Sequence, residues 1–252
     1  MNNKRLNGFR TFQIVIFVIF ILPILAPILA RLGLTFPAQL IYFLYSFSCH
    51  QLDWRSIHLF DYQIAWCARD TLIWGGILAS TFIIERSKFR VKYYHVLPFI
   101  VPIALDGGIQ TIATMLGLTQ GAEFYTSTNF MRALTGGFFG LGMGMFLSTL
   151  VYEMNGTEEL KDNFLSSMKI SLLGTGILIV FYLLLVTLWS VTSLTYKPAN
   201  ILDFEVKTPV SLSDRWTRQS HGLCKGSAPK DITNGNSINN LIFSPADCFN
   251  AK

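Results

Sequence analysis

Polar and ionisable residues interrupt the apolar runs of this sequence. Cys49-His50-Gln51 closes one run, Cys67-Ala68-Arg69-Asp70 interrupts the next, and Asp106 and Gln110 lie within a third. A charge in hydrocarbon costs between ~3 and more than ~10 kcal/mol, so it is seldom retained without a partner or a task. We therefore expect a binding or catalytic site where these segments meet.

Thiols, an imidazole and a carboxylate together form a donor set suited to zinc or another transition metal. The predicted metal ligands are Cys49, His50, Cys67 and Asp70. Their spacing matches no compact zinc motif, and two alternatives stay open. Cys49 and Cys67 could form a disulfide in an oxidising compartment, or both could be small buried residues.

Arg69 and Asp106 are natural counter-charges. As a structural pair they would hold two helices together. In a pocket, Arg69 or Arg132 would hold an anionic group and Asp106 would handle a proton. Both uses stay open, and no catalytic residue is assigned. The candidate ligand-binding residues are His50, Arg69, Asp70, Asp106, Gln110, Asn129 and Arg132.

The elements that must position these residues are helices in a membrane. The chain of 252 residues is 51% hydrophobic and only 14% charged, whereas about 25% is usual for soluble domains. A span needs about 20 apolar residues. Candidate spans are Thr11 to Ala30, Tyr62 to Ile84, Tyr93 to Leu118, Ala133 to Tyr152 and Ile170 to Tyr196, with a further apolar run from Leu32 to Leu52.

Loop charge predicts the orientation. The segment from Glu85 to Lys92 is rich in Arg and Lys, which favours the cytoplasmic side. We prefer five transmembrane helices with Leu32 to Leu52 as a re-entrant or interfacial helix, because six spans would place Lys4, Arg5 and Arg10 outside. A helix that starts at Tyr62 would carry Arg69 about 10–12 Å below the outer surface, at ~1.5 Å per residue.

The predicted fold is therefore all-α, with a helical transmembrane domain over 1–196 and a small irregular tail over 197–252. The tail is predicted to be extracytoplasmic, partly extended and rich in Pro, Ser and Asn, and Cys224 and Cys248 are expected to form a disulfide there.

Small residues recur every four positions at Gly136, Gly140, Gly144 and Ser148. This spacing lets helix backbones approach closely within a membrane. Close packing inside the chain is the simpler interpretation, and contact with other membrane subunits through Gly136, Gly140 and Gly144, or through the tail, is the alternative. The net charge of +5 is explained by the short loops, so we expect the lipid bilayer and no nucleic acid as a partner.

The segments Cys49-His50-Gln51, Trp66 to Thr71, Asp106 to Gln110 and Asn129 to Gly136 occur in this order. Together they resemble a family of prokaryotic integral membrane proteins known as domain of unknown function 2085. Many members are similar to Cys-Ala-Arg-Cys where this chain has Cys67-Ala68-Arg69-Asp70. That difference argues against a shared all-cysteine metal site, although aspartate can still be a ligand.

The expected function is a cell-membrane protein with an outward-facing polar site in the outer half of the bilayer. The site would bind a small ligand, a metal ion or a lipid headgroup. A membrane enzyme acting on a lipid-linked substrate and an accessory subunit of a larger membrane complex are the alternatives. No cofactor motif is present, and zinc or another transition metal is the cofactor that the donor set suggests.

Overall fold

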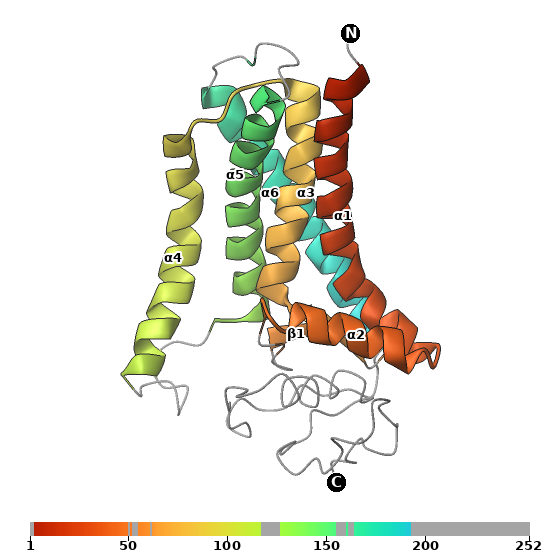
Figure 1. Cartoon of the computed structure of the whole chain (residues 1–252). Coiled ribbons are helices and arrows are strands. Elements are labelled where there is room, and N and C mark those ends of the chain that lie inside the picture. Colours follow the sequence, from red (N-terminus) through yellow and green to blue (C-terminus); the bar gives the residue numbers. More distant parts are fainter. Residues whose placement is uncertain are drawn as a thin grey trace. The chain divides into compact units, whose positions relative to one another are not determined.

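The computed structural model describes residues 3–49, 51, 55–60, 62–116, 127–154, 160 and 164–192. These residues are mostly helical, as the apolar runs predict (Figure 1). The helices are α1 (Asn3–Arg31), α2 (Thr35–Tyr45), α3 (Ala68–Ser87), α4 (Tyr93–Met115), α5 (Asn129–Met154) and α6 (Phe164–Thr192), and the strands are β1 (Ser56–Leu59) and β2 (Tyr62–Cys67). The predicted tail, with Cys224 and Cys248, lies outside the described residues.

Within the described residues, four helices are long and apolar enough to cross a membrane. They are Gly8–Arg31, Tyr93–Ala113, Asn129–Met154 and Leu172–Thr192. Helix α3 has 20 residues, but charged residues occupy its first and last turns. Helix α2 has 11 residues and is about 16 Å long, which is too short for a crossing.

The prediction of one continuous span from Tyr62 to Ile84 is wrong. Tyr62–Cys67 is strand β2, which pairs antiparallel with β1, and helix α3 begins only at Ala68. Arg69 therefore lies in the first turn of a helix rather than two turns inside one. The estimated depth of Arg69 below the outer surface assumed a helix from Tyr62, so that estimate is also wrong.

The contacts within the chain divide it into two units, and each is described by itself. Unit 1 comprises Met1–Phe20 and Ala68–Leu183, and unit 2 comprises Ile21–Cys67 and Leu184–Lys252. The division does not follow the predicted boundary at residue 197. It cuts through α1 and α6, and it falls between the end of β2 and the start of α3.

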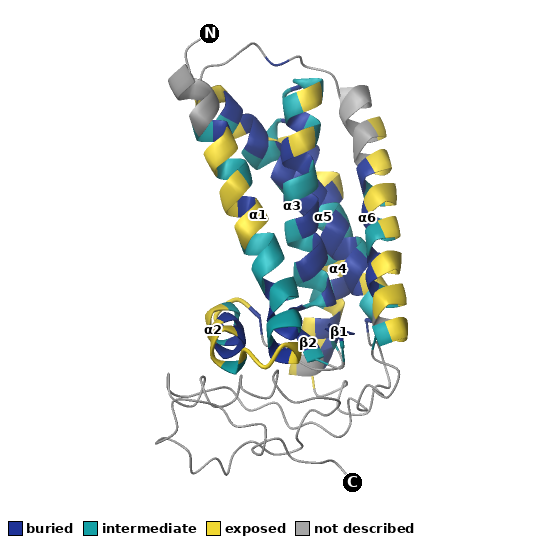
Figure 2. Ribbon diagram, turned by 90° about the vertical axis from the view of Figure 1, so that its right-hand side faces the viewer, coloured by how far each residue is buried: buried dark blue, intermediate teal, exposed yellow. Residues whose placement is uncertain are grey.

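In unit 1, α5 lies between α3 and α4 and contacts both (Figure 1). Its most apolar window is 56% buried, against 22–28% in the other three candidate spans, so α5 is the most enclosed helix. Dark blue buried residues likewise concentrate on α3 and α5 in Figure 2.

The glycine stripe of α5 is covered by α3. A Cβ atom at Gly140 would lie 2.1 Å from the Ile73 carbonyl oxygen, and one at Gly144 would lie 2.6 Å from the Ile77 Cα. Only glycine permits this approach of the two backbones. These glycines therefore pack against α3 within the chain, as the simpler interpretation predicts.

One end of unit 1 gathers the start of α1 and the ends of α3 and α5. Gln13 donates a hydrogen bond of 2.9 Å from Nε2 to Glu85 Oε2. The rings of Phe9 and Tyr152 meet edge to face with centroids 5.4 Å apart. The chain therefore starts at the same end of unit 1 as the basic segment from Glu85 to Lys92.

In unit 2, the second half of α1 packs against α2 and the hairpin of β1 and β2. The buried cluster consists of Ala26, Ala30, Ala38, Ile41, Tyr42 and Ala65. The small alanine side chains allow the helices and the hairpin to pack closely around Tyr42, which is fully buried.

Candidate functional site

The Arg69–Asp106 pair in unit 1 joins the first turn of α3 to the middle of α4. Arg69 donates from Nη2 to Asp106 Oδ2, and the Thr135 hydroxyl of α5 lies 3.3 Å from the same oxygen. The side chains are 21% and 5% exposed, respectively. The predicted counter-charges therefore meet, and three helices supply the groups around the carboxylate.

Two glycines leave space for the arginine. A Cβ at Gly107 of α4 would lie 3.2 Å from Arg69 Nη1, and one at Gly136 of α5 would lie 2.6 Å from the Arg69 carbonyl oxygen. Gly136 thus brings the α5 backbone against the start of α3. Gly107 leaves room for the Arg69 guanidinium on α4, directly after Asp106, with which Arg69 pairs.

A hydrogen-bond donor of Arg69 remains available. Its Nε is buried and has no hydrogen-bond partner in the part of the chain that the structure describes. A buried donor without an acceptor costs about 1–3 kcal/mol. An oxygen atom placed beside this nitrogen would recover that cost.

Three further predicted residues lie on the same helices. Arg132 is 3% exposed and donates from Nη1 to Asn129 Oδ1 at 3.0 Å, within the first turn of α5. Arg132 precedes Gly136 by one helical turn, toward the end of α5 that carries Asn129. Gln110 is buried one turn beyond Asp106 on α4.

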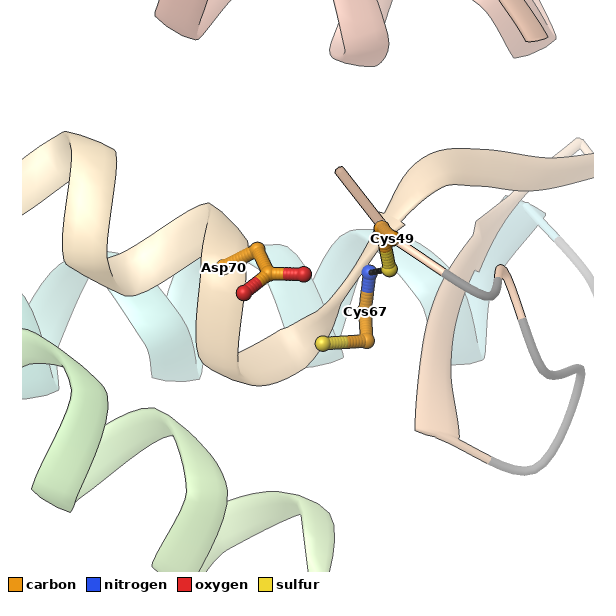
Figure 3. Close-up of side chains that lie close together, drawn as sticks. All are labelled: Cys49, Cys67 and Asp70. Atoms are coloured by element: carbon orange, nitrogen blue, oxygen red, sulfur yellow. Dashed lines mark hydrogen bonds between the residues drawn. The ribbon is translucent and has the colours of Figure 1, made fainter. Parts of the chain in front are cut away.

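A second group of predicted residues, the thiol pair, lies in unit 2. The sulfur atoms of Cys49 and Cys67 are within 4.8 Å of each other, and the Asp70 carboxylate is within the same distance of the Cys67 sulfur (Figure 3). Asp70 follows Cys67 by three residues along the continuous chain. The other predicted metal ligand, His50, lies outside the described residues.

The structure does not support the alternative of a disulfide between Cys49 and Cys67. Neither cysteine forms a disulfide in it. Their backbones hold the sulfurs near each other but not at the bonded distance of about 2 Å. Polar groups converge on the Cys49 sulfur.

Two backbone N–H groups point at the Cys49 sulfur. They belong to Cys67, at 3.3 Å, and Gln51, at 3.5 Å. Gln51 has a φ of 52°, a left-handed conformation that is uncommon for a residue with a side chain. This turn folds the chain back so that the N–H of Gln51 reaches a sulfur two residues earlier.

A polar network fixes that turn, and sequence reasoning missed it. Gln51 donates from Nε2 to the Tyr42 carbonyl at 2.8 Å, and Gln63 donates from Nε2 to the Gln51 carbonyl at 2.6 Å and to Ser56 Oγ at 3.0 Å. The Tyr42 hydroxyl in turn donates to the Gln63 carbonyl. Burial raises the pKa of Tyr42 well above its usual value, so this donor stays protonated at physiological pH.

The signal for this network was present in the sequence only as polar residues at strand positions. Gln63 and Ser56 lie on β2 and β1, whose residues are buried on both faces. A buried glutamine must find hydrogen-bond partners. Once the hairpin is recognised, the amide group of Gln63 identifies the segment that it holds, because it donates to the Gln51 carbonyl.

The long apolar helices, together with a charged pair enclosed by α3, α4 and α5, define an integral membrane protein of the helical class. The family model described as "Predicted membrane protein (DUF2085)" matches residues 49–146. The chain is also 33% identical over 150 residues to "Uncharacterized protein MJ1492" of Methanocaldococcus jannaschii, an alignment that covers 55% of this chain and 89% of the relative. The chain belongs to the DUF2085 family of predicted membrane proteins, in agreement with the resemblance of its four motifs.

The matched region contains both groups of candidate residues, from Cys49 through Arg132. No solved structure matches the chain.

Proposed function

We propose that this membrane protein binds a small anionic oxygen group, of the phosphate type, at the Arg69–Asp106 pair. The observation that carries this proposal is the buried Nε of Arg69, which has no hydrogen-bond acceptor among the described residues. Guanidinium groups present several N–H donors in one plane and match the oxygens of a phosphate or carboxylate. Nη2 of this guanidinium donates to Asp106, and the N–H at Nε remains as a donor for a ligand.

The charges around the pair support an anion rather than a cation. Asp106 already accepts from Arg69 and faces the Thr135 hydroxyl, so its negative charge is compensated within the protein. Arg132 is a second buried cation, one helical turn before Gly136 on α5. A phosphate oxygen arriving beside Arg69 would gain charge-assisted hydrogen bonds in a region of low dielectric constant.

The site would lie in the outer half of the cell membrane. The start of α1 and the basic segment from Glu85 to Lys92 share one end of unit 1, and a basic segment favours the cytoplasm. Arg69 begins α3, and Glu85 is near its other end. The cytoplasmic end is therefore opposite to Arg69.

The same arrangement favours five crossings over six. If the N-terminus and the Glu85 segment are both cytoplasmic, an even number of crossings separates them. Helices α1 and α3 supply two, and α2 is too short to add a third. Helices α4, α5 and α6 would complete the five, with the 197–252 region extracytoplasmic.

Phosphate binding can be tested on the purified full chain. In detergent, inorganic phosphate should raise the thermal unfolding midpoint of the wild-type chain, because a ligand that binds only the folded state stabilises it. Arg69→Gln should abolish that rise. The matched control is Arg90→Gln, since Arg90 forms an exposed pair with Glu153 at the other end of unit 1.

The same assay can distinguish a lipid headgroup from a free anion as the source of the phosphate group. If the natural ligand is a lipid headgroup, nanodiscs of phosphatidylglycerol should stabilise the wild-type chain more than nanodiscs of phosphatidylcholine, and Arg69→Gln should remove the difference. If it is a free anion, only inorganic phosphate should act. A chain that responds to neither, or whose response survives Arg69→Gln, would refute the proposal.

A further inference from the structure

We infer that Cys49, Cys67 and Asp70 form a binding site for a thiophilic divalent metal ion, with zinc as the expected occupant. The inference does not rest on the anion site, because neither Arg69 nor Asp106 is among the three proposed ligands. It rests instead on the distances between the ligand atoms, the hydrogen bonds to sulfur and the network that holds the Cys49 turn.

The distances suit a single ion. Zinc–sulfur bonds are about 2.3 Å long, so two sulfurs on one tetrahedral ion lie ~3.8 Å apart. The sulfurs of Cys49 and Cys67 are within 4.8 Å, which a small change in a side-chain torsion would close. The Asp70 oxygen is equally near to the Cys67 sulfur and would be the third ligand (Figure 3).

The surroundings favour the thiolate form that a metal requires. The two N–H groups directed at Cys49 stabilise negative charge on its sulfur. Cys67 immediately precedes α3, so its backbone N–H, which is directed at the Cys49 sulfur, lies at the start of that helix.

The turn is also held in the way that metal sites are held. Residues around the ligands of a metal usually fix their orientation through hydrogen bonds, and their loss costs 10- to 100-fold in affinity, by order of magnitude. Here the Gln63 amide binds the carbonyl of Gln51, and the Gln51 amide binds the carbonyl of Tyr42. The turn between Cys49 and Gln51 is thereby fixed from two elements of unit 2.

The donor set determines which metal would bind. Two thiolates exclude magnesium and calcium, which prefer oxygen ligands, and favour zinc and softer ions. Aspartate in place of a third thiolate lowers the preference for the softest ions relative to zinc. Three protein ligands leave a fourth position on a tetrahedral ion for water or another group.

The test is a cobalt titration of the purified full chain under reducing conditions. Cobalt replaces zinc in such sites, and its bonds to thiolates give a charge-transfer absorption. We expect this absorption to saturate at one equivalent, and zinc to abolish it. Cys49→Ser and Cys67→Ser should each weaken cobalt binding by about 100-fold, whereas the double variant Cys224→Ser/Cys248→Ser should retain it.

Asp70 keeps the test decisive if a cysteine variant fails to fold. Asp70→Asn should weaken cobalt binding by at least about 10-fold, and Asp70→Cys should tighten cadmium binding because it adds a soft ligand. Glu153→Gln, an acidic residue at the opposite end of unit 1, is the matched control and should change neither. Absence of the charge-transfer absorption, or binding that survives Cys49→Ser or Asp70→Asn, would overturn the inference.

Discussion

A buried ion pair such as Arg69–Asp106 is not by itself a source of stability. Desolvation of two charges offsets most of their attraction, so replacing a whole pair by apolar residues is often neutral. Removal of one partner is different, since the other charge is then left in a region of low dielectric constant. Both partners here are enclosed by α3, α4 and α5, and Asp106 is the more buried.

Asp106→Leu should therefore destabilise the chain more than its double replacement with Arg69→Met. We expect a loss of ~2–3 kcal/mol of unfolding free energy for the single variant, somewhat below the usual cost because Arg69 keeps some exposure. The double variant should recover at least half of that loss. Denaturant unfolding in mixed micelles measures both values. Additive effects in the double-mutant cycle would contradict a direct coupling of the two side chains.

At the scale of helices and strands, the interface of α3 with α5 is set by glycine. Gly136, Gly140 and Gly144 each lie against atoms of α3. In the other direction, a Cβ at Gly76 of α3 would lie 2.7 Å from the Gly137 carbonyl oxygen. Lipid tails are as apolar as leucine, so close packing rather than exclusion of water holds such helices together. This interface fixes the position of Arg69 against Gly136.

Gly140→Ala is expected to disrupt this interface. Its Cβ would lie 2.1 Å from the Ile73 carbonyl oxygen, and a backbone atom cannot rotate away, so α3 and α5 must separate. We expect a loss of about 3 kcal/mol, at the upper end of the cost of overpacking.

The matched control is Gly176→Ala on α6, where nothing lies within 4 Å of the new Cβ. Alanine favours a helix over glycine by roughly 0.5–1 kcal/mol, so this variant should be neutral or slightly stabilising. Thermal unfolding in detergent compares the two. Equal midpoints would show that the backbones are not in contact.

The hairpin is the element that sequence reasoning could not find. Half-buried strands alternate between apolar and polar residues, but β2 is buried on both faces and its sequence does not alternate. The turn between them contains Phe60 at a φ of 56°, where Asn or Gly is usual. The prediction therefore merged Tyr62–Cys67 and α3 into one helix.

At the scale of the whole molecule, sequence reasoning was reliable where one physical cause dominates. The long apolar runs predicted α1, α4, α5 and α6, because only helices satisfy every backbone group inside hydrocarbon. The Arg69–Asp106 pairing followed from the cost of a lone charge. The Gln63 network was not predictable, because it depends on which segments meet after folding and leaves no periodic pattern.

The number of crossings is the last consequence of this arrangement, and it can be measured with cysteine reporters. In a background with all four native cysteines replaced by serine, a reporter is placed at Asn7, Ser87 or Leu116. A membrane-impermeant maleimide is then applied to intact cells. With five crossings, Leu116→Cys should be labelled at once, because it follows the outer end of α4, whereas Asn7→Cys and Ser87→Cys should react only after permeabilisation.

Other numbers of crossings give different labelling patterns. Adding or removing one crossing moves the segments on one side of it to the opposite side of the membrane. With six crossings, α2 would cross and Asn7→Cys would be labelled in intact cells while Ser87→Cys stayed protected. If α3 did not cross, Ser87→Cys would be labelled and Leu116→Cys protected. The hydrogen bond of Gln13 to Glu85 makes the first alternative the more informative to test, since it holds the start of α1 at the Ser87 end of unit 1. Labelling of Asn7→Cys in intact cells would mean that these two segments lie on opposite sides of the membrane, and the packing of α1 against α3 would have to be abandoned.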